Sequence, residues 1–292
     1  MNLESLKNCH AQALPLARRL RLPLRSRVWK GQSGEFSGGG TGSSLDFHDH
    51  RGYAPGDDPR HINWQAYART GSYTMKLFRE EVRPVVEVVI DVSDSMFFTP
   101  AKAIRTAELF YLITESAQAA GASLAVHAVK GERHLSLDPT VLRTHCWYEV
   151  VSALAPAHPA QAPEISRLSL RSNAVRIFLS DLLFPGDPGL FLRHLGQGRG
   201  SAIIFSPFLQ EEEDPGWSGN YEFIDTEEKT QHPHRIEPAV LKRYRESYQR
   251  HFTWWNEQAR RQQVVLARIP CEEDLAAVLL REAVRCGALE AG

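Results

Sequence analysis

The arrangement of apolar positions changes at Pro84. Beyond that residue, short runs rich in β-branched residues alternate with longer segments in which apolar residues recur at helical spacing. This alternation predicts a doubly wound α/β domain built on a mostly parallel sheet. The segments expected to form strands are 85–91, 123–131, 132–138, 173–183, 200–209, 221–225, 234–236 and 264–271.

Helices are expected between these strands. Residues 100–119 carry a broad apolar face, and Pro100 is acceptable in a first helical turn. Further helices are expected at 141–154, 237–262 and 273–285. The aromatic residues of the longest helix, including Trp254 and Trp255, are interpreted as packing residues. The acidic run from Glu211 to Asp214 is interpreted as a solvated loop.

The chain before Pro84 is less regular. Residues 1–44 are interpreted as a basic arm followed by a Gly/Ser-rich loop, with Pro15 and Pro23 preventing one long helix. The arm is expected to be a solvated helix face or a tail folded back on acidic surface. Residues 45–83 are expected to form a small N-terminal β embellishment packed on the main domain, which spans 84–292.

Composition limits the possible functions. The 34 Lys and Arg residues against 35 Asp and Glu residues give a net charge of -1, which argues against general nucleic-acid binding. The apolar runs are shorter than the ~20 residues of a membrane span, so we expect a soluble, cytoplasmic protein, with peripheral membrane contact through the arm left open. The four cysteines lack C-x-x-C spacing, which predicts reduced thiols rather than a zinc ribbon or disulfides.

The segment VVEVVIDVSDSM places a polar cluster at the end of the first buried strand. Asp91, Ser93 and Ser95 supply one carboxylate and two hydroxyls there. Oxygen-only ligands suit Mg²⁺, with Mn²⁺ or Ca²⁺ as alternatives. In the common strand order 3-2-1-4-5-6, the strand ending at Asp181 would lie beside the one ending at Asp91. The two carboxylates would then share one cation and leave a coordination position open.

Other interpretations of these residues were weighed. Asp and Ser after a strand often cap the following helix. A haloacid dehalogenase-like phosphatase needs D-x-D, and Ser93 stands where its general acid would be. Neither serine lies in G-x-S-x-G. A zinc or manganese enzyme site is disfavoured by ligand spacing, although His48, Asp49, His50, Asp57, Asp58 and His61 cluster in the sequence.

The residues from Asp91 to Ser95 resemble the metal-ion-dependent adhesion site of the von Willebrand factor A domain family. Asp181 matches the later aspartate of that motif, and the resemblance covers about residues 84–292. It implies a Rossmann-like von Willebrand A fold. It also implies that the open metal position accepts a carboxylate from a protein partner. The third loop of such a site supplies a threonine, for which Thr140 and Thr144 are the candidates.

A second resemblance lies upstream, in RGYAPGDDPRHINW from Arg51 to Trp64, followed by Ala68-Arg69. This segment is similar to the signature of the bacterial family called domain of unknown function 58, whose members join it to a von Willebrand A-like domain. Such proteins are typically encoded near MoxR-type AAA+ ATPases, which the resemblance implies as a partner.

The signature residues also have a physical interpretation. Pro and Gly are placed for a tight turn, and Asp side chains bond to nearby amides. We expect an internal charge network of aspartates and arginines with Trp64 packed beneath it. The residues assigned this structural role are Arg51, Tyr53, Gly56, Asp57, Asp58, Arg60, Trp64 and Arg69.

The sequence therefore favours a non-catalytic, metal-dependent interaction module, an adaptor working with a MoxR-type ATPase in the assembly or maturation of another complex. Its partner would present an acidic side chain to the cation. The alternative is a metal-assisted hydrolase of the phosphoesterase type that uses the same strand-end carboxylates.

Overall fold

The computed structural model of the protein describes residues 1–24, 45–54, 59–80, 83–156, 158, 161–227 and 230–292, without the side chains of 45–50, 61 and 76–80. The chain forms two compact units. Met1–Val28 and Pro84–Gly292 make up the main unit, and Trp29–Arg83 makes up the second unit.

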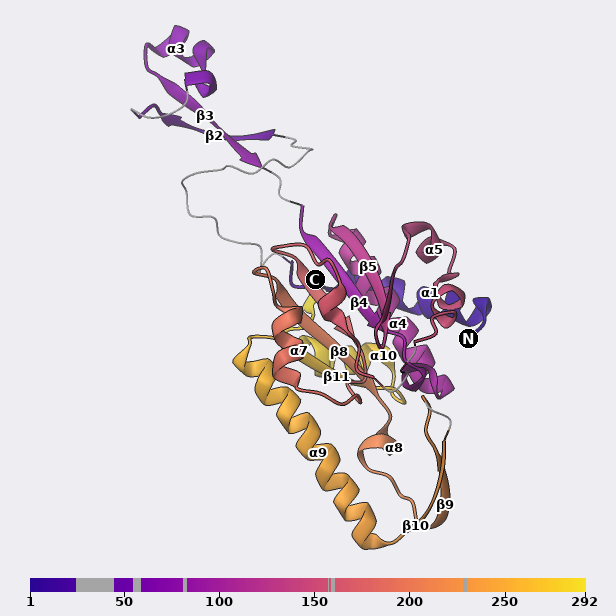
Figure 1. Ribbon diagram of the computed structural model, residues 1–292. Coiled ribbons are helices and arrows are strands. Elements are labelled where there is room, and N and C mark those ends of the chain that lie inside the picture. The colour runs from indigo at the N-terminus through magenta and orange to yellow at the C-terminus, as the bar shows by residue number, and fades with distance from the viewer. Residues whose placement is uncertain (25–44, 55–58, 81–82, 157, 159–160, 228–229) are drawn as a thin grey trace. The chain divides into compact units, whose positions relative to one another are not determined.

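A six-stranded sheet forms the centre of the main unit (Figure 1). The five parallel strands lie in the order β11, β8, β7, β4 and β5, and β6 is antiparallel at the edge beside β5. When the six strands are numbered in chain order and read from β6 to β11, this is the expected order 3-2-1-4-5-6. Their bounds are β4 Val85–Asp91, β5 Ser123–Lys130, β6 Arg133–Ser136, β7 Val175–Leu179, β8 Ser201–Phe208 and β11 Val265–Pro270.

The central strands are apolar because helices cover both faces of the sheet. In β4 every residue after Val85 is buried, and all five residues of β7 are buried. A strand with both faces covered has no polar side, so its sequence shows a continuous apolar run rather than an alternation. The prediction of a mostly parallel α/β sheet is therefore confirmed.

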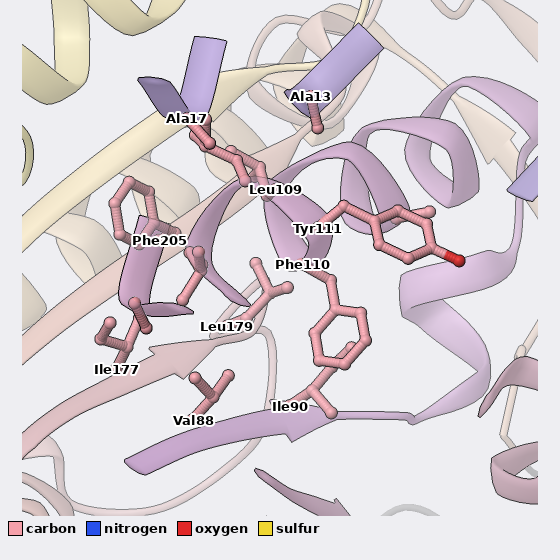
Figure 2. Close-up of a cluster of buried hydrophobic side chains, with 14 of the residues drawn as sticks. Ala13, Ala17, Val88, Ile90, Leu109, Phe110, Tyr111, Ile177, Leu179 and Phe205 are labelled. Carbon is pink, nitrogen blue, oxygen red and sulfur yellow. The ribbon is translucent and has the colours of Figure 1, made fainter. Parts of the chain in front are cut away.

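Two layers of helix cover one face. Helix α4 (Pro100–Ala119) packs on the sheet, and α1 (Leu3–Arg19) packs on α4. Figure 2 shows Leu109 and Phe110 of α4 between the strands and the side chains of Ala13 and Ala17 on α1. Because α4 lies between sheet and helix, even its polar residues, such as Thr106 and Ser116, are buried.

The position of α1 differs from the arm expected at the N-terminus. Its buried face consists mainly of small residues, Cys9, Ala13 and Ala17, which let the two helix backbones approach closely. The helix also continues through Pro15. The two-residue strand β1 (Leu20–Arg21) pairs with β12 (Glu290–Ala291) and thereby joins the beginning of the chain to its end.

The other face of the sheet is covered by α7 (Pro188–Leu195) and the long α9 (Pro238–Arg261). Trp255 is 1% exposed and contacts Phe191 of α7, as expected for a packing residue, whereas Trp254 is 42% exposed. In the described part of the chain, no helix is both long and apolar enough to cross a membrane.

The helix expected at 141–154 is instead two short helices, α5 (Pro139–Arg143) and α6 (Trp147–Ser152). His145 separates them with a φ of 59°, a left-handed conformation that ends a right-handed helix. The Nδ1 atom of His145 lies 2.9 Å from the hydroxyl of Tyr111.

The remaining elements of the main unit are α8 Gln210–Glu213, β9 Gly219–Ile224, β10 Gln231–Ile236, α10 Leu275–Val278, a π-helical turn Leu279–Val284, and the 3-10 turns Asp94–Phe97 and Ile165–Arg167.

The second unit contains the antiparallel strands β2 (Leu45–Gly52) and β3 (Thr74–Glu80). Between them lie a 3-10 turn, Pro59–His61, and the helix α3, Trp64–Thr70. Asn63 caps α3 by accepting a hydrogen bond from the amide of Ala66 at 3.2 Å.

A buried ion pair joins β4 to β7 near the start of both strands. Glu87 and Arg176 are paired in the register, and Arg176 Nε donates to Glu87 Oε2 over 3.3 Å. The Arg176 guanidinium is fully buried and also donates to the carbonyls of Leu195 and Arg171. A buried charge this well bonded fixes the relative register of the two strands, whose far ends carry Asp91 and Asp181.

Gly200 gives the Arg176 guanidinium the space it occupies. A Cβ at this position would lie 2.5 Å from Arg176 Nη1 and 3.1 Å from the carbonyl oxygen of Ala174. We expect Gly200→Ala to lower the free energy of unfolding by about 1–3 kcal/mol, measured by urea denaturation. Gly216→Ala is the matched control, because nothing lies within 4 Å of its Cβ position. Equal stability of the two variants would contradict this account.

Candidate functional site

Asp91 and Asp181 converge at the carboxyl ends of β4 and β7. The register pairs Ile90 with Leu179, so Asp91 lies beside Ser180, and the Ser180 hydroxyl donates to Asp91 Oδ2 over 2.7 Å. The two aspartates are 1% and 2% exposed. With Ser93 and Ser95 they line a cavity of about 40 Å³. The structure therefore brings together all four of these predicted residues.

The loop after Asp91 holds the two hydroxyls close to each other. The Ser93 amide donates to Asp91 Oδ1 over 3.0 Å, a local turn that Asp commonly forms. The hydroxyls of Ser93 and Ser95 hydrogen-bond to each other, with their oxygens 3.1 Å apart. Ser93 is the N-cap residue of the following 3-10 turn, yet its side chain makes no capping hydrogen bond. Neither side chain therefore caps the 3-10 turn: the Asp91 carboxylate closes a local turn, and the Ser93 hydroxyl makes no capping hydrogen bond.

The charge of Asp91 is unfavourable in this site. Burial, and then repulsion from Asp181, raises the pKa of Asp91 to about 7, although hydrogen bonds from Ser180 and Ser93 lower it. A carboxyl with a pKa this high ionises near neutral pH only at a cost in folding free energy. A cation placed beside it would remove that cost.

Asp181, in contrast, forms an ion pair with a basic side chain. Lys102 of α4, 1% exposed, donates to Asp181 Oδ2 over 2.8 Å and to Glu212 Oε1 over 2.6 Å. Burial lowers the pKa of Lys102, but the two carboxylates outweigh it, and the net pKa is raised. Asp181 Oδ1 accepts from the amide of Leu183 over 3.0 Å, so both oxygens of Asp181 are hydrogen-bonded.

Among the described residues, Lys102 forms ion pairs with Asp181 and Glu212 and none with Asp91. Lys102 is absent from the described residues that line the cavity shared by Asp91 and Asp181. The cavity side of Asp91 therefore remains without a basic side chain in the described part of the protein.

The role of Glu212 corrects the interpretation of the acidic run as a solvated loop. Residues Gln210–Glu213 form the helix α8. Its acidic residues bond to neighbouring elements: Glu212 to Lys102, Glu213 to Arg268 and Glu211 to Trp217. Asp214 forms an ion pair with Arg245 of α9. A run of like charge is stable here because each carboxylate meets its own partner.

The segment after β7 is held in an uncommon conformation. Leu182 has a φ of 62°, which β-region and helical residues do not adopt. Two contacts hold the backbone of Leu182 in this conformation. Its amide donates a hydrogen bond to Ser180 Oγ, and its carbonyl oxygen lies 2.8 Å from His251 Nε2. The next residue, Leu183, is 42% exposed at the rim of the cavity. Local strain of this kind is common at binding sites.

Neither threonine candidate reaches the cavity. Thr140 lies within α5, and the Thr144 hydroxyl donates to the Thr140 carbonyl over 3.0 Å, as in an ordinary helix end. The described residues that line the cavity include neither of them. Three other loops contribute to the cavity lining instead, through Gly131, Gln161 and Glu227.

Glu227 is a site residue that the sequence analysis missed. It lies in the turn after β9 and accepts a hydrogen bond from the Ser95 amide through Oε1 over 3.0 Å. Its other carboxylate oxygen is buried and has no hydrogen-bond partner in the described part of the protein. Burial raises the pKa of Glu227. No local pattern marks it, since 132 residues separate it from Ser95.

The donor set fits a hard divalent cation better than zinc. In the described residues there is no group of three or more His, Cys, Asp or Glu side chains placed to hold a metal. Any cation would therefore need the Ser93 and Ser95 hydroxyls. Their separation of 3.1 Å is close to the edge of an octahedron with metal–oxygen distances of about 2.1 Å, which is roughly 3.0 Å.

The signature residues lie in the second unit, and the aspartates of the charge network expected among them fall outside the described residues. Gly56, Asp57 and Asp58 lie outside the described residues, as do the side chains of the His48, Asp49, His50 and His61 cluster. Trp64 is not packed beneath a charge network, because it is 58% exposed. It makes edge contacts with Tyr67 and Tyr73, which stack on each other. Arg51, Tyr53, Arg60 and Arg69 are exposed.

The raised pKa of Asp91 gives stability a predictable pH dependence. Because this pKa, about 7, is above the ordinary value near 3.9, the folded state binds the extra proton and stability falls as pH rises between them. We expect Asp91→Asn to gain about 3 kcal/mol of stability relative to the parent between pH 5 and pH 8, since about two pKa units of that range lie below the pKa of Asp91. Thermal unfolding in chelator at pH 5 and pH 8 measures the difference. The same offset at both pH values would refute the assignment, and the exposed Glu222→Gln serves as control.

Comparison with known proteins gives a family. A family model described as "Protein of unknown function DUF58" matches residues 49–254. Two solved structures are similar at 10% identity and a TM-score of 0.35, each covering 70% of this chain and 98% of its own. One is the conserved hypothetical protein BatB from Bacteroides thetaiotaomicron, and the other an aerotolerance-related membrane protein from Bacteroides fragilis NCTC 9343. A similarity at this level carries no inference. No curated protein matches the chain.

Proposed function

We propose that this chain, which belongs to the family of proteins of unknown function DUF58, is a non-catalytic module that binds a protein partner through a divalent cation. Its main unit would be a von Willebrand A-like domain, and Asp91, Ser93 and Ser95 would form its adhesion-type metal site. The observation that carries the proposal is the pair of hydroxyls 3.1 Å apart, beside the buried carboxylate of Asp91, which no basic side chain of the described residues pairs with.

Each site residue has a separate part in the proposal. Ser93 and Ser95 would hold the cation directly through their hydroxyl oxygens. The Asp91 carboxylate would balance part of the positive charge of the cation. The Ser180 hydroxyl and the Ser93 amide would orient that carboxylate. Asp181 would act through water, because Lys102 and the Leu183 amide already occupy its oxygens. Mg²⁺ is the preferred cation, since it favours oxygen ligands and retains waters.

The surface beside the site favours a protein partner. A second cavity of about 350 Å³ is lined by Val92, Asp94 and Thr226, which alternate in sequence with residues of the first cavity. The two cavities are therefore adjacent. Phe98, which is 63% exposed, contributes to the larger one, and Leu183 to the rim of the smaller. Exposed apolar side chains around a charged centre suit a protein surface better than a small hydrophilic substrate.

The proposed partner presents an acidic side chain to the cation. By the family resemblance, we propose a MoxR-type AAA+ ATPase, with the pair acting in assembly or maturation of another complex. The alternative function, a metal-assisted hydrolase, would use the same carboxylates. It predicts metal-dependent turnover by the isolated chain, whereas the adaptor predicts none.

Metal binding is the first test of the proposal. We expect calorimetry to detect one Mn²⁺ or Mg²⁺ per chain, lost in Asp91→Ala and weakened at least tenfold when Ser93 and Ser95 are both changed to Ala. The exposed Ser166→Ala is the matched control and should bind like the parent. Binding that is unaffected by Asp91→Ala would place the cation elsewhere and refute the site.

Partner capture is the second test. Immobilised protein should retain a purified MoxR-type ATPase in Mg²⁺, and both chelator and Asp91→Ala should abolish retention. The isolated chain should show no turnover of phosphoester or peptide substrates with Mg²⁺ or Mn²⁺. Capture that is indifferent to chelator and to the substitution would contradict the adaptor mechanism. Metal-dependent turnover that vanishes in Asp91→Ala would establish the hydrolase instead.

A further inference from the structure

The hairpin formed by β9 and β10 reaches the cavity from a distant part of the chain. The two strands form six antiparallel residue pairs between Gly219 and Ile236. Most of their side chains are exposed, and apolar contact is concentrated near Phe223, which packs against Trp217 with a ring separation of 5.2 Å. The turn that follows β9 then places Glu227 against Ser95.

The local structure presents the Glu227 side chain to the cavity. Asp225 Oδ1 accepts a hydrogen bond from the Glu227 amide over 2.8 Å, which shapes the turn. Glu227 Oε1 then accepts from the Ser95 amide over 3.0 Å. The carboxylate is therefore fixed at one oxygen on the same backbone segment that carries both site hydroxyls.

The Asp94 backbone also lowers the pKa of the Glu227 carboxyl, but the second carboxylate oxygen makes no hydrogen bond as well formed as the one from Ser95. Glu227 Oε2 is buried without a hydrogen-bond partner in the described residues, and Glu227 lines the cavity with Asp91, Ser93 and Ser95. Leaving a buried carboxylate oxygen without a partner is costly, so such an atom calls for an explanation. The need to bond the Ser95 amide explains Oε1 but not the burial of Oε2.

We propose that Glu227 is an internal ligand of the metal site, whose Oε2 takes the coordination position that a partner's carboxylate would otherwise fill. The inference rests on the proposed function and adds a condition to it. A partner must displace the turn at Glu227 before its own acidic side chain reaches the cation. The site is therefore closed by the chain itself until a partner competes successfully, which makes affinity depend on the hairpin as well as on the metal.

The conservative variant Glu227→Gln separates this role from a structural one. The Gln carbonyl oxygen still accepts the Ser95 amide hydrogen bond, but the anionic oxygen is gone. We expect Mn²⁺ affinity to fall about tenfold or more, and water-proton relaxation to show about one additional exchangeable water on the bound Mn²⁺. Acetate, used as a probe for a partner's carboxylate, should displace that water in Glu227→Gln and have little effect on the parent.

Glu222→Gln is the matched control, because Glu222 is an exposed residue of the same hairpin. It should leave affinity, relaxation and the acetate response unchanged. If the parent binds Mn²⁺ in an Asp91-dependent manner and Glu227→Gln leaves affinity and hydration unaltered, the internal ligand is refuted while the metal site stands. If the parent shows no Asp91-dependent binding, the proposed function itself fails. Comparable thermal unfolding of the variants shows that each is folded.

Discussion

The site depends on the parallel pairing of β4 with β7. This pairing places Ile90 opposite Leu179, and so the residues that follow, Asp91 and Ser180, meet at the same edge of the sheet. Shifting one strand by a single residue would turn its side chains to the opposite face and separate the two ends. The register is held by continuous burial along both strands and by the buried contact between Glu87 and Arg176. A structural ion pair at one end of the strands therefore maintains the geometry at the other.

The charges at this edge are divided unequally. Asp181 and Glu212 share the Lys102 ammonium, and this buried network ties α4 and α8 to the end of β7. Asp91 receives hydrogen bonds from Ser93 and Ser180, and its pKa is raised to about 7 by burial and by Asp181. A protein that needed only structural stability would gain from an uncharged residue at this position. The cost in folding free energy of a buried carboxylate is explained if Asp91 binds a cation when the protein functions.

Much of this organisation is readable from sequence, because burial leaves a local pattern. The apolar run before Asp91 and the helical spacing at 100–119 gave β4 and α4 at their observed bounds. The alternation of strands and helices indicated a doubly wound sheet, and the common strand order of such sheets is the one observed. The convergence of Asp91, Ser93, Ser95 and Asp181 followed from that order. Residues whose role depends on partners distant in sequence were not accessible in this way. Nothing local marks Lys102 as buried or Glu227 as part of the cavity.

The errors have similar physical causes. The small residues Ala13 and Ala17 of α1 do not form a conspicuous apolar stripe, although they allow close helix packing against α4. The threonine expected from family resemblance stays within α5 and its C-terminal end, because the helix breaks at His145 and does not project a side chain toward the cavity. The common strand order thus predicted that the two strand ends meet, whereas the rest of the cavity lining comes from loops that no local sequence pattern marks.

The most direct test of the central claim is a crystal structure of the protein grown with Mn²⁺, with anomalous diffraction recorded at the manganese edge. The account predicts one anomalous peak within about 2.3 Å of the hydroxyl oxygens of both Ser93 and Ser95, with Lys102 still bonded to Asp181. A cavity without a peak at saturating Mn²⁺, or a Lys102 ammonium moved into contact with Asp91, would contradict it.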